Sequence, residues 1–146
     1  MATLNRNAAE SMMEIGVNAC SDVTGFGLLG HLREMVEGAK VSAHLNLSNV
    51  PVIPGTLELL CKGIAPGGTE RNLNSIMKVT TWDTEISDSG KLLLSDAQTS
   101  GGLLISVDRT KVNDLLGKLT ANGVNGARII GDIVQADGPS RIFVHP

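Results

Sequence analysis

The sequence predicts an α/β (α+β) fold in which a mixed β-sheet packs with helices. Apolar residues recur at helical spacing in some segments and alternate with polar residues in others, and the two kinds of segment follow one another along the chain. With 146 residues, 42% hydrophobic and 18% charged, the chain has the size and composition of a globular unit. We therefore interpret residues 1–146 as a single domain.

The first half of the chain opens with a helical pattern. Met12 and Ile15 belong to an apolar stripe that predicts a helix over residues 2–15, ended by Gly16. A short apolar strand over residues 17–20 follows. The other elements expected in this half are a helix over about 25–37, a strand of alternating apolar and polar residues over 41–47, and a short helix over 55–61.

The second half is less regular at its start. Residues 64–75 form a glycine-rich loop that opens a short helix at Glu70. A turn through residues 137–139 joins the last two strands into a predicted terminal hairpin. The elements expected here are a strand over 79–82, a helix over 88–94, a buried strand over 103–107, an amphipathic helix over 108–119 capped by Asp108, and strands over 128–134 and 141–145.

Composition excludes several kinds of partner. The net charge is −3, with 12 basic and 15 acidic residues spread along the chain, so no basic surface for nucleic acid or membrane is predicted. No apolar run can span a bilayer, and the N-terminal segment lacks the core of a signal peptide. Cys20 and Cys61 show no metal-ligand spacing, and we expect reduced thiols rather than a disulfide. The expected compartment is the cytoplasm.

The first motif that carries chemistry is the segment Asp22-Val23-Thr24-Gly25-Phe26-Gly27, between a strand and a helix. A helix N-terminus offers free N–H groups to a phosphate, and Asp22 could hold Mg²⁺ beside it. In the alternative interpretation Asp22 or Thr24 caps the helix and the glycines ease a tight turn. Spacing alone favours this alternative. The segment is not a Walker A loop, because no Lys-Ser/Thr pair follows.

Two further loops carry the same ambiguity. In Pro66-Gly67-Gly68-Thr69-Glu70-Arg71-Asn72, the glycine amides and Arg71 could bind a phosphate or carboxylate, but a surface turn with Thr69 as a helix cap is favoured. The segment Asp96-Ala97-Gln98-Thr99-Ser100-Gly101-Gly102 lines a site, or a subunit contact, or satisfies its own backbone.

Several single residues are not expected to act chemically. Ser100 lacks a G-x-S-x-G elbow and a histidine partner, so a nucleophilic role is not predicted. Asp132 is interpreted as a polar residue on a strand face, and His31 as an interior or interface histidine with satisfied nitrogens. His31, His44 and His145 are scattered along the sequence, and no zinc site is indicated.

The three segments together resemble the selenophosphate synthetase (selenide, water dikinase) family. Residues 19–32, ACSDVTGFGLLGHL, are similar to its signature, and so are the two later loops and the opening Leu4-Asn5. The resemblance covers about 130 residues and implies the C-terminal-domain fold of the aminoimidazole ribonucleotide synthetase superfamily. Those synthetases share a shorter D-[IV]-T-G-G-G element, whose middle glycine is Phe26 here.

The resemblance implies half of an ATP-dependent phosphotransferase, which converts ATP, selenide and water to selenophosphate, AMP and phosphate. Asp22 matches an aspartate that binds Mg²⁺ at the ATP phosphates. Thr24, Gly25 and Gly27 would face the same cleft, whereas Arg71, Asn72, Gln98, Thr99 and Ser100 match positions without an assigned role. The catalytic Cys or selenocysteine, the catalytic Lys and most metal-binding aspartates belong to an N-terminal half that we expect to be absent, with Met1 at an interior position of longer members.

The sequence therefore predicts a chain that contributes Asp22 but no catalytic residue, and that folds without turning over substrate alone. Its partners would be ATP, selenide and the missing half, in an enzyme that is a homodimer. Two alternatives stay open: the C-terminal domain of a purine-pathway ATP-dependent synthetase, and a standalone non-catalytic remnant. An isolated domain is also expected to expose an apolar patch where the missing half docks.

Overall fold

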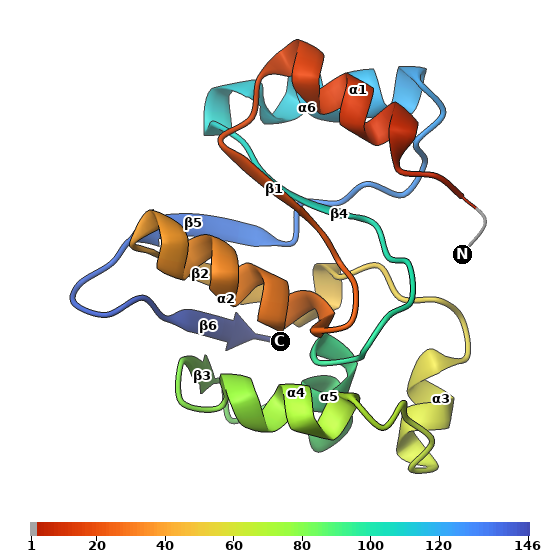
Figure 1. The fold of residues 1–146 in the computed structure, drawn as a ribbon, viewed down its shortest axis with the longest axis vertical. Helices are drawn as coiled ribbons and strands as arrows, with labels where there is room; N and C mark the ends of the chain where they lie inside the picture. The colour runs from red at the N-terminus through yellow and green to blue at the C-terminus, as the bar shows by residue number, and fades with distance from the viewer. Residues whose placement is uncertain (1–2) are drawn as a thin grey trace.

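The fold is seen in a computed structural model that describes residues 3–146 (Figure 1). Helices and strands alternate as the sequence predicts, and the α/β fold class is confirmed. The elements are α1 (Arg6–Ile15), β1 (Ala19–Asp22), α2 (Gly27–Ala39), β2 (Val41–Asn46), α3 (Thr56–Cys61), α4 (Thr69–Ile76), β3 (Thr80–Trp82), α5 (Asp88–Leu94), β4 (Leu103–Ser106), α6 (Val112–Ala121), β5 (Gly131–Gln135) and β6 (Ile142–His145). Short 3₁₀ turns, η1 (Leu47–Asn49) and η2 (Arg109–Lys111), complete the set.

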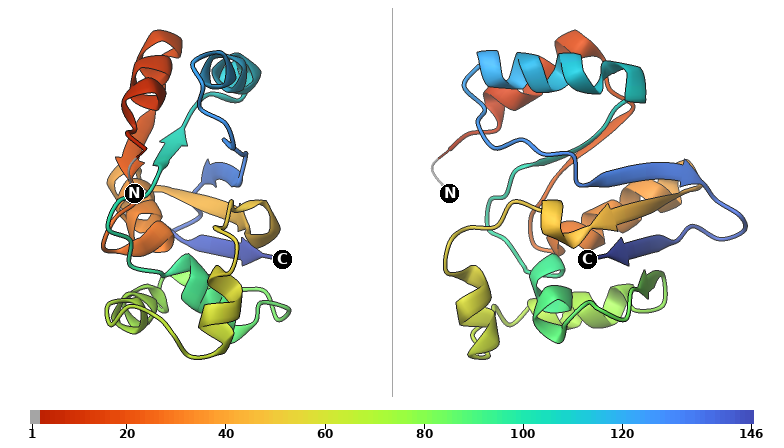
Figure 2. Two further views of the ribbon diagram at one scale, coloured as in Figure 1. Left: turned by 90° about the vertical axis from the view of Figure 1, so that its right-hand side faces the viewer. Right: turned by 180° about the vertical axis from the view of Figure 1, so that it is seen from behind.

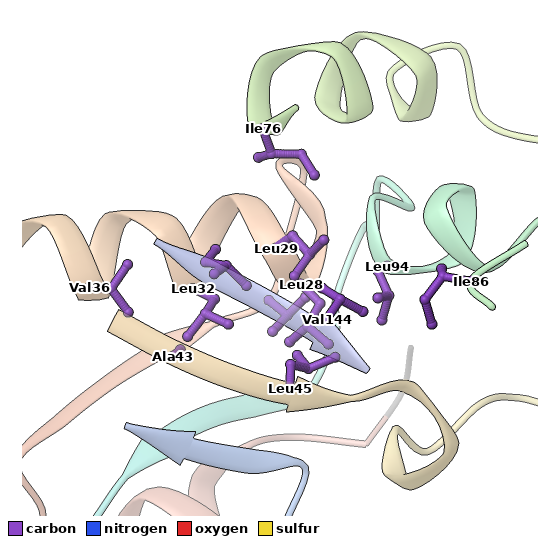
Figure 3. Packing of buried hydrophobic residues seen from close by; sticks show 12 residues of the cluster. Leu28, Leu29, Leu32, Val36, Ala43, Leu45, Ile76, Ile86, Leu94 and Val144 are labelled. Carbon is purple, nitrogen blue, oxygen red and sulfur yellow. The ribbon is translucent and has the colours of Figure 1, made fainter. Parts of the chain in front are cut away.

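A four-stranded mixed sheet in the order β3-β6-β2-β5 forms the centre of the molecule. β2 runs parallel to β6 and antiparallel to β5, and β3 runs parallel to β6. α2 covers one face of this sheet, and the apolar side chains of α2 point at those of β2 and β6 (Figure 3). The most deeply buried side chains of this core include Leu29, Leu45, Ile76, Leu94 and Ile142.

The predicted terminal hairpin is wrong. β5 and β6 do not pair with each other, because β2 lies between them and pairs with both. In this position β2 pairs its backbone groups along both edges, one with β5 and the other with β6. If β5 and β6 formed a hairpin, only one of them could pair with β2. The connection 136–141 crosses two strand spacings, about 10 Å, and six residues reach about 20 Å.

A second, two-stranded sheet pairs β1 antiparallel with β4. It leads from the central sheet to a separate pair of helices, α1 and α6 (Figure 1). These helices enclose a small apolar cluster around Ala8, Leu115 and Leu119. The β1–β4 ribbon lies between the two clusters: Leu104 packs against the central one, and Leu103 and Ile105 pack against the small one.

The lower part of the molecule contains α3, α4 and α5 (Figure 1). α4 packs on α2, and α5 lies beside α4 and α3. α3 is poorly covered: Leu60 is buried, but Ile53, Leu57, Leu59 and Ile64 in and around α3 are exposed. We call residues 52–64 the α3 segment.

Some element bounds differ from the expected ones. The first strand begins and ends two residues later than predicted, so Asp22 is its last residue. Asp108 does act as a cap, but of the turn η2, where its carboxylate accepts a hydrogen bond from the Thr110 N–H, and α6 begins only at Val112. None of the helices between residues 3 and 146 is long and apolar enough to cross a membrane.

Candidate functional site

The three motifs of the sequence meet at one place, which we call the junction. The first and third motifs extend the β1–β4 pairing: Val23 N–H donates to Gly102 O at 3.0 Å, and Gly101 N–H donates to Val23 O at 2.9 Å. The Gln98 N–H donates to Thr24 O at 3.1 Å. The loop before β4 is thereby joined to the loop after β1 by backbone hydrogen bonds.

At two positions of the junction another backbone segment approaches so closely that only glycine fits. A Cβ on Gly101 would lie 2.4 Å from Val23 O, which is far inside van der Waals contact. Gly27 has φ +72°, and a Cβ there would lie 2.7 Å from the carbonyl group of Ser95. A side chain at either position would push two motifs apart, so these glycines serve the contact between loops.

The second motif joins the junction through side chains of α4. The Asn72 amide donates to Gly25 O at 2.8 Å and to Ser95 O at 3.1 Å, and so bridges the other two motifs. The fully buried Thr69 hydroxyl donates to the Asp96 carboxylate at 3.1 Å and accepts from Ala97 N–H. The expected helix cap at Thr69 is therefore wrong, since its hydroxyl binds the third motif instead.

Asp22 lies at the open side of the junction. Its side chain is exposed at the end of β1, and no hydrogen bond or ion pair joins its carboxylate to any of residues 3–146. The alternative in which Asp22 or Thr24 caps α2 is wrong, because α2 begins after Phe26 without a side-chain cap. The carboxylate is free to accept a ligand.

The backbone beside Asp22 also carries unused donors. In the part of the chain that the structure describes, the N–H groups of Thr24, Gly25 and Phe26 make no hydrogen bond. Gly25 has open space around it, since a Cβ there would meet nothing within 4 Å. Successive free N–H groups at the start of a helix form a site for an anion.

His31 fixes the turn that carries Asp22. It is 7% exposed, and its two ring nitrogens lie 3.4 Å from the Ser21 hydroxyl and 3.1 Å from the Thr24 hydroxyl. Glu34 approaches its Nδ1 at 3.4 Å. The prediction of a satisfied interior histidine is confirmed. The Thr24 hydroxyl is engaged by His31, so the group of Thr24 that remains available for a ligand is its backbone N–H.

Phe26 stands out as an exposed aromatic residue at the junction. Its side chain is 59% exposed, and its ring lies 5.7 Å from that of His31. Gly30 makes room for it, since a Cβ on Gly30 would lie 2.7 Å from the Phe26 Cβ. Phe26 and Gly30 are thus matched in one turn of α2.

The two cysteines are both free, as predicted. Partial burial, and to a lesser extent the nearby Asp22 carboxylate, raise the pKa of the Cys20 thiol. A raised pKa keeps this thiol protonated at neutral pH, so Cys20 is a poor nucleophile. Cys61 is exposed on α3, where its sulfur lies 3.5 Å from the Ser89 hydroxyl.

The remaining sequence candidates are more peripheral. Arg71, Thr99 and Ser100 are exposed and make no side-chain hydrogen bond within residues 3–146. Asp132 pairs with Arg109 at 2.6 Å on a strand face, away from the junction. Sequence reasoning missed the bridging amide of Asn72, although the resemblance marked its position, because its acceptors are 23 and 47 residues away.

The residues at the junction fit Mg²⁺ as one part of a ligand set. Among residues 3–146, no group of three or more His, Cys, Asp or Glu side chains could hold a metal ion. Mg²⁺, however, is commonly held by one or two carboxylates together with substrate phosphates and water. An unengaged carboxylate beside three free N–H groups is compatible with that pattern, in which Asp22 could supply the protein ligand.

The fold and the junction define a domain class. The family described as "AIR synthase related protein, C-terminal domain" matches residues 1–144, and the chain belongs to this family. Its sequence relatives include selenide, water dikinases. That of Carboxydothermus hydrogenoformans is 44% identical over 129 residues, which is 88% of this chain and 37% of the relative. That of Porphyromonas gingivalis is 41% identical over 145 residues, 99% of this chain and 41% of the relative.

The chain thus spans about two-fifths of the length of these relatives. Among solved structures, Escherichia coli HypE, a hydrogenase maturation protein, shares the fold with a TM-score of 0.61 at 19% identity. The likeness covers 96% of this chain and 35% of HypE. The resemblance to selenide, water dikinases drawn from the three motifs is confirmed, and so is the fold of the superfamily.

Proposed function

We propose that this chain is the C-terminal half of a selenophosphate synthetase, in which ATP, selenide and water yield selenophosphate, AMP and phosphate. The single observation that carries the proposal is the free Asp22 carboxylate beside three unpaired N–H groups at the junction. The motifs at this junction are those that resemble the family, and relatives with that name match nearly the whole chain. The enzyme would act in the cytoplasm, where thiols stay reduced, as a homodimer.

In this proposal the junction binds the triphosphate of ATP. The N–H groups of Thr24, Gly25 and Phe26 donate to phosphate oxygens, and Gly25 lets a phosphate approach the backbone closely. Gly27 keeps the start of α2 against Ser95, so that the helix N-terminus faces the ligand. Asp22 would hold Mg²⁺. When bound, this ion supplies positive charge that offsets the repulsion between the triphosphate and an anionic nucleophile. His31 keeps the turn in position.

A hybrid enzyme tests this proposal. The matching C-terminal portion of the Porphyromonas gingivalis relative is replaced by this chain, and selenide-dependent formation of AMP is measured. We expect turnover by the hybrid and none by this chain alone, because a single carboxylate cannot hold the metal ions that neutralise a triphosphate. Asp22→Asn should lower the rate by about 100-fold or more, since metal-held charge contributes several kcal/mol.

The control is Asp137→Asn, which removes an exposed carboxylate in the β5–β6 connection and should leave the rate unchanged. Equal rates for Asp22→Asn and Asp137→Asn would show that Asp22 is not a ligand. Formation of AMP by the chain alone would overturn its proposed dependence on a second half.

The sequence element shared by the purine-pathway synthetases differs from this chain at Phe26, a residue with a structural role. Phe26 replaces the middle glycine of the D-[IV]-T-G-G-G element, and Gly30 accommodates it. Supplying the hybrid with a formylglycinamidine substrate in place of selenide separates the two reactions. Turnover of that substrate without selenide would favour the purine synthetase.

A further inference from the structure

The face of the central sheet opposite α2 carries a pair of histidines that the proposed function does not use. Figure 2, in the view from behind, shows β5, β2 and β6 in front of α2 with no helix over them. His44 on β2 and His145 on β6 lie on this open face and are half-buried. Phe143, directly opposite His44 in the ladder, stacks on its ring at 4.8 Å.

The two imidazoles meet nitrogen to nitrogen. His44 Nδ1 lies 2.8 Å from His145 Nε2, and the ring planes differ by 5°. In the neutral pair one of these nitrogens carries a proton, and the other accepts a hydrogen bond from that N–H. A single N–H therefore lies between two atoms that could each bind a metal ion. Imidazole nitrogens are among the commonest protein ligands for transition metals.

We propose that His44 Nδ1 and His145 Nε2 together bind a divalent transition-metal ion that accepts ligands at right angles, of the Ni²⁺ or Cu²⁺ type. Two nitrogens at about 2.0–2.1 Å from such an ion lie about 2.9 Å apart, whereas a tetrahedral site separates them by about 3.3 Å. The observed 2.8 Å agrees with the right-angle arrangement.

Binding replaces the hydrogen bond between the rings. The proton between the nitrogens moves to the other nitrogen of its own ring, so the pair stays neutral and both lone pairs face the ion. Both rings must turn slightly for their lone pairs to converge, and the soft χ2 torsion of histidine permits this. No bond of the backbone ladder has to break.

The surroundings favour an accessible site completed by water. Asp132, opposite His44 on β5, is engaged by Arg109 at 2.6 Å. Within residues 3–146 no third His, Cys, Asp or Glu completes a ligand set. The ion would keep open positions, so it binds reversibly, and hard cations that require oxygen ligands gain nothing from two imidazoles.

Calorimetric titration of the tag-free chain with Ni²⁺ tests the site. We expect one Ni²⁺ per chain, binding that weakens in acid because protons compete for the ligand nitrogens, and no heat from Mg²⁺. His44→Gln and His145→Gln should each weaken Ni²⁺ by about tenfold or more, because one of two ligands is removed. Cys61→Ser should bind as the parent does, which excludes the exposed thiol.

Nuclear magnetic resonance of the unmodified chain supplies a check that needs no variant. Paramagnetic Ni²⁺ should broaden the amide signals of His44, Phe143 and Asp132 before those of Asp22 and Gly25. Ni²⁺ binding by both glutamine variants at parental affinity, broadening that begins at Asp22, or tighter binding of Zn²⁺ than of Ni²⁺ would each overturn the proposal.

Discussion

The junction and the α3 segment are both rich in loops, yet they are built in opposite ways. At the junction, three motifs are joined by backbone bonds and by the side chains of Thr69 and Asn72 on α4, and two glycines leave no space for a Cβ. In the α3 segment, apolar side chains such as Ile53 and Leu57 are exposed, and neither Gly55 nor Gly63 has a neighbour within 4 Å of a built Cβ. Small polar residues can therefore be more tightly constrained than large apolar ones.

Gly101→Ala is expected to have the largest effect on stability of the substitutions that test this contrast. Its Cβ would lie 2.4 Å from Val23 O, so the loop must shift and lose its ladder bonds, at a cost of about 3 kcal/mol or more of unfolding free energy. Gly102→Ala, one residue along with open space, is the matched control and should change stability by about 0.5 kcal/mol or less. Urea denaturation measures both, and equal losses would mean that the junction is not tightly packed.

A smaller loss is expected from Asn72→Ala. The variant leaves the carbonyls of Gly25 and Ser95 without their side-chain donor, which should lower the unfolding free energy by about 2 kcal/mol. Asn74→Ala on the same helix removes an exposed amide that makes no hydrogen bond within residues 3–146. Thermal unfolding of the pair should rank Asn72→Ala well below Asn74→Ala.

In the α3 segment, polar substitution should leave stability nearly unchanged. Leu57→Ser, at a side chain that is 45% exposed, should alter the unfolding free energy by about 0.5 kcal/mol or less in urea denaturation. Leu60→Ser, at a buried position of the same helix, should lose about 2–5 kcal/mol. If Leu57→Ser unfolds as readily as Leu60→Ser, the segment is packed rather than exposed.

The subtlest prediction concerns thiol reactivity in the two regions. The pKa of Cys20 is raised by burial and then by Asp22, so at pH 8 it holds less thiolate and should react with a thiol reagent more slowly than the exposed Cys61. Asp22→Asn removes the smaller cause and should speed the reaction of Cys20 only partly. No change in its rate would mean that the carboxylate does not act on the thiol.

Local patterns predicted the elements better than their pairing. The stripe that includes Leu28, Leu32 and Val36 predicted α2, and alternation predicted β2, because each pattern reports only which side of an element is buried. The order of strands depends on contacts between distant residues, and the placement of β2 between β5 and β6 left no local trace.

The candidate site was likewise predictable in part. The motifs and their resemblance located Asp22 and the three loops, but not why Asn72 and Thr69 are polar, since their partners belong to other motifs. The histidine pair was missed for the same reason. His44 and His145 are 101 residues apart, and only the β2–β6 register brings them together.

The strand order also bears on how the chain acquires its structure during synthesis. β6, made last among these strands, lies between β2 and β3, so β3 has no strand partner until residues 142–145 have left the ribosome. The apolar side chains of β2 and α2 are not fully covered until Ile142 and Val144 pack against them. Such pairing across a hundred residues is slow to form. The nascent domain therefore passes through a stage in which its largest apolar surface is exposed, and a chaperone would be most useful then.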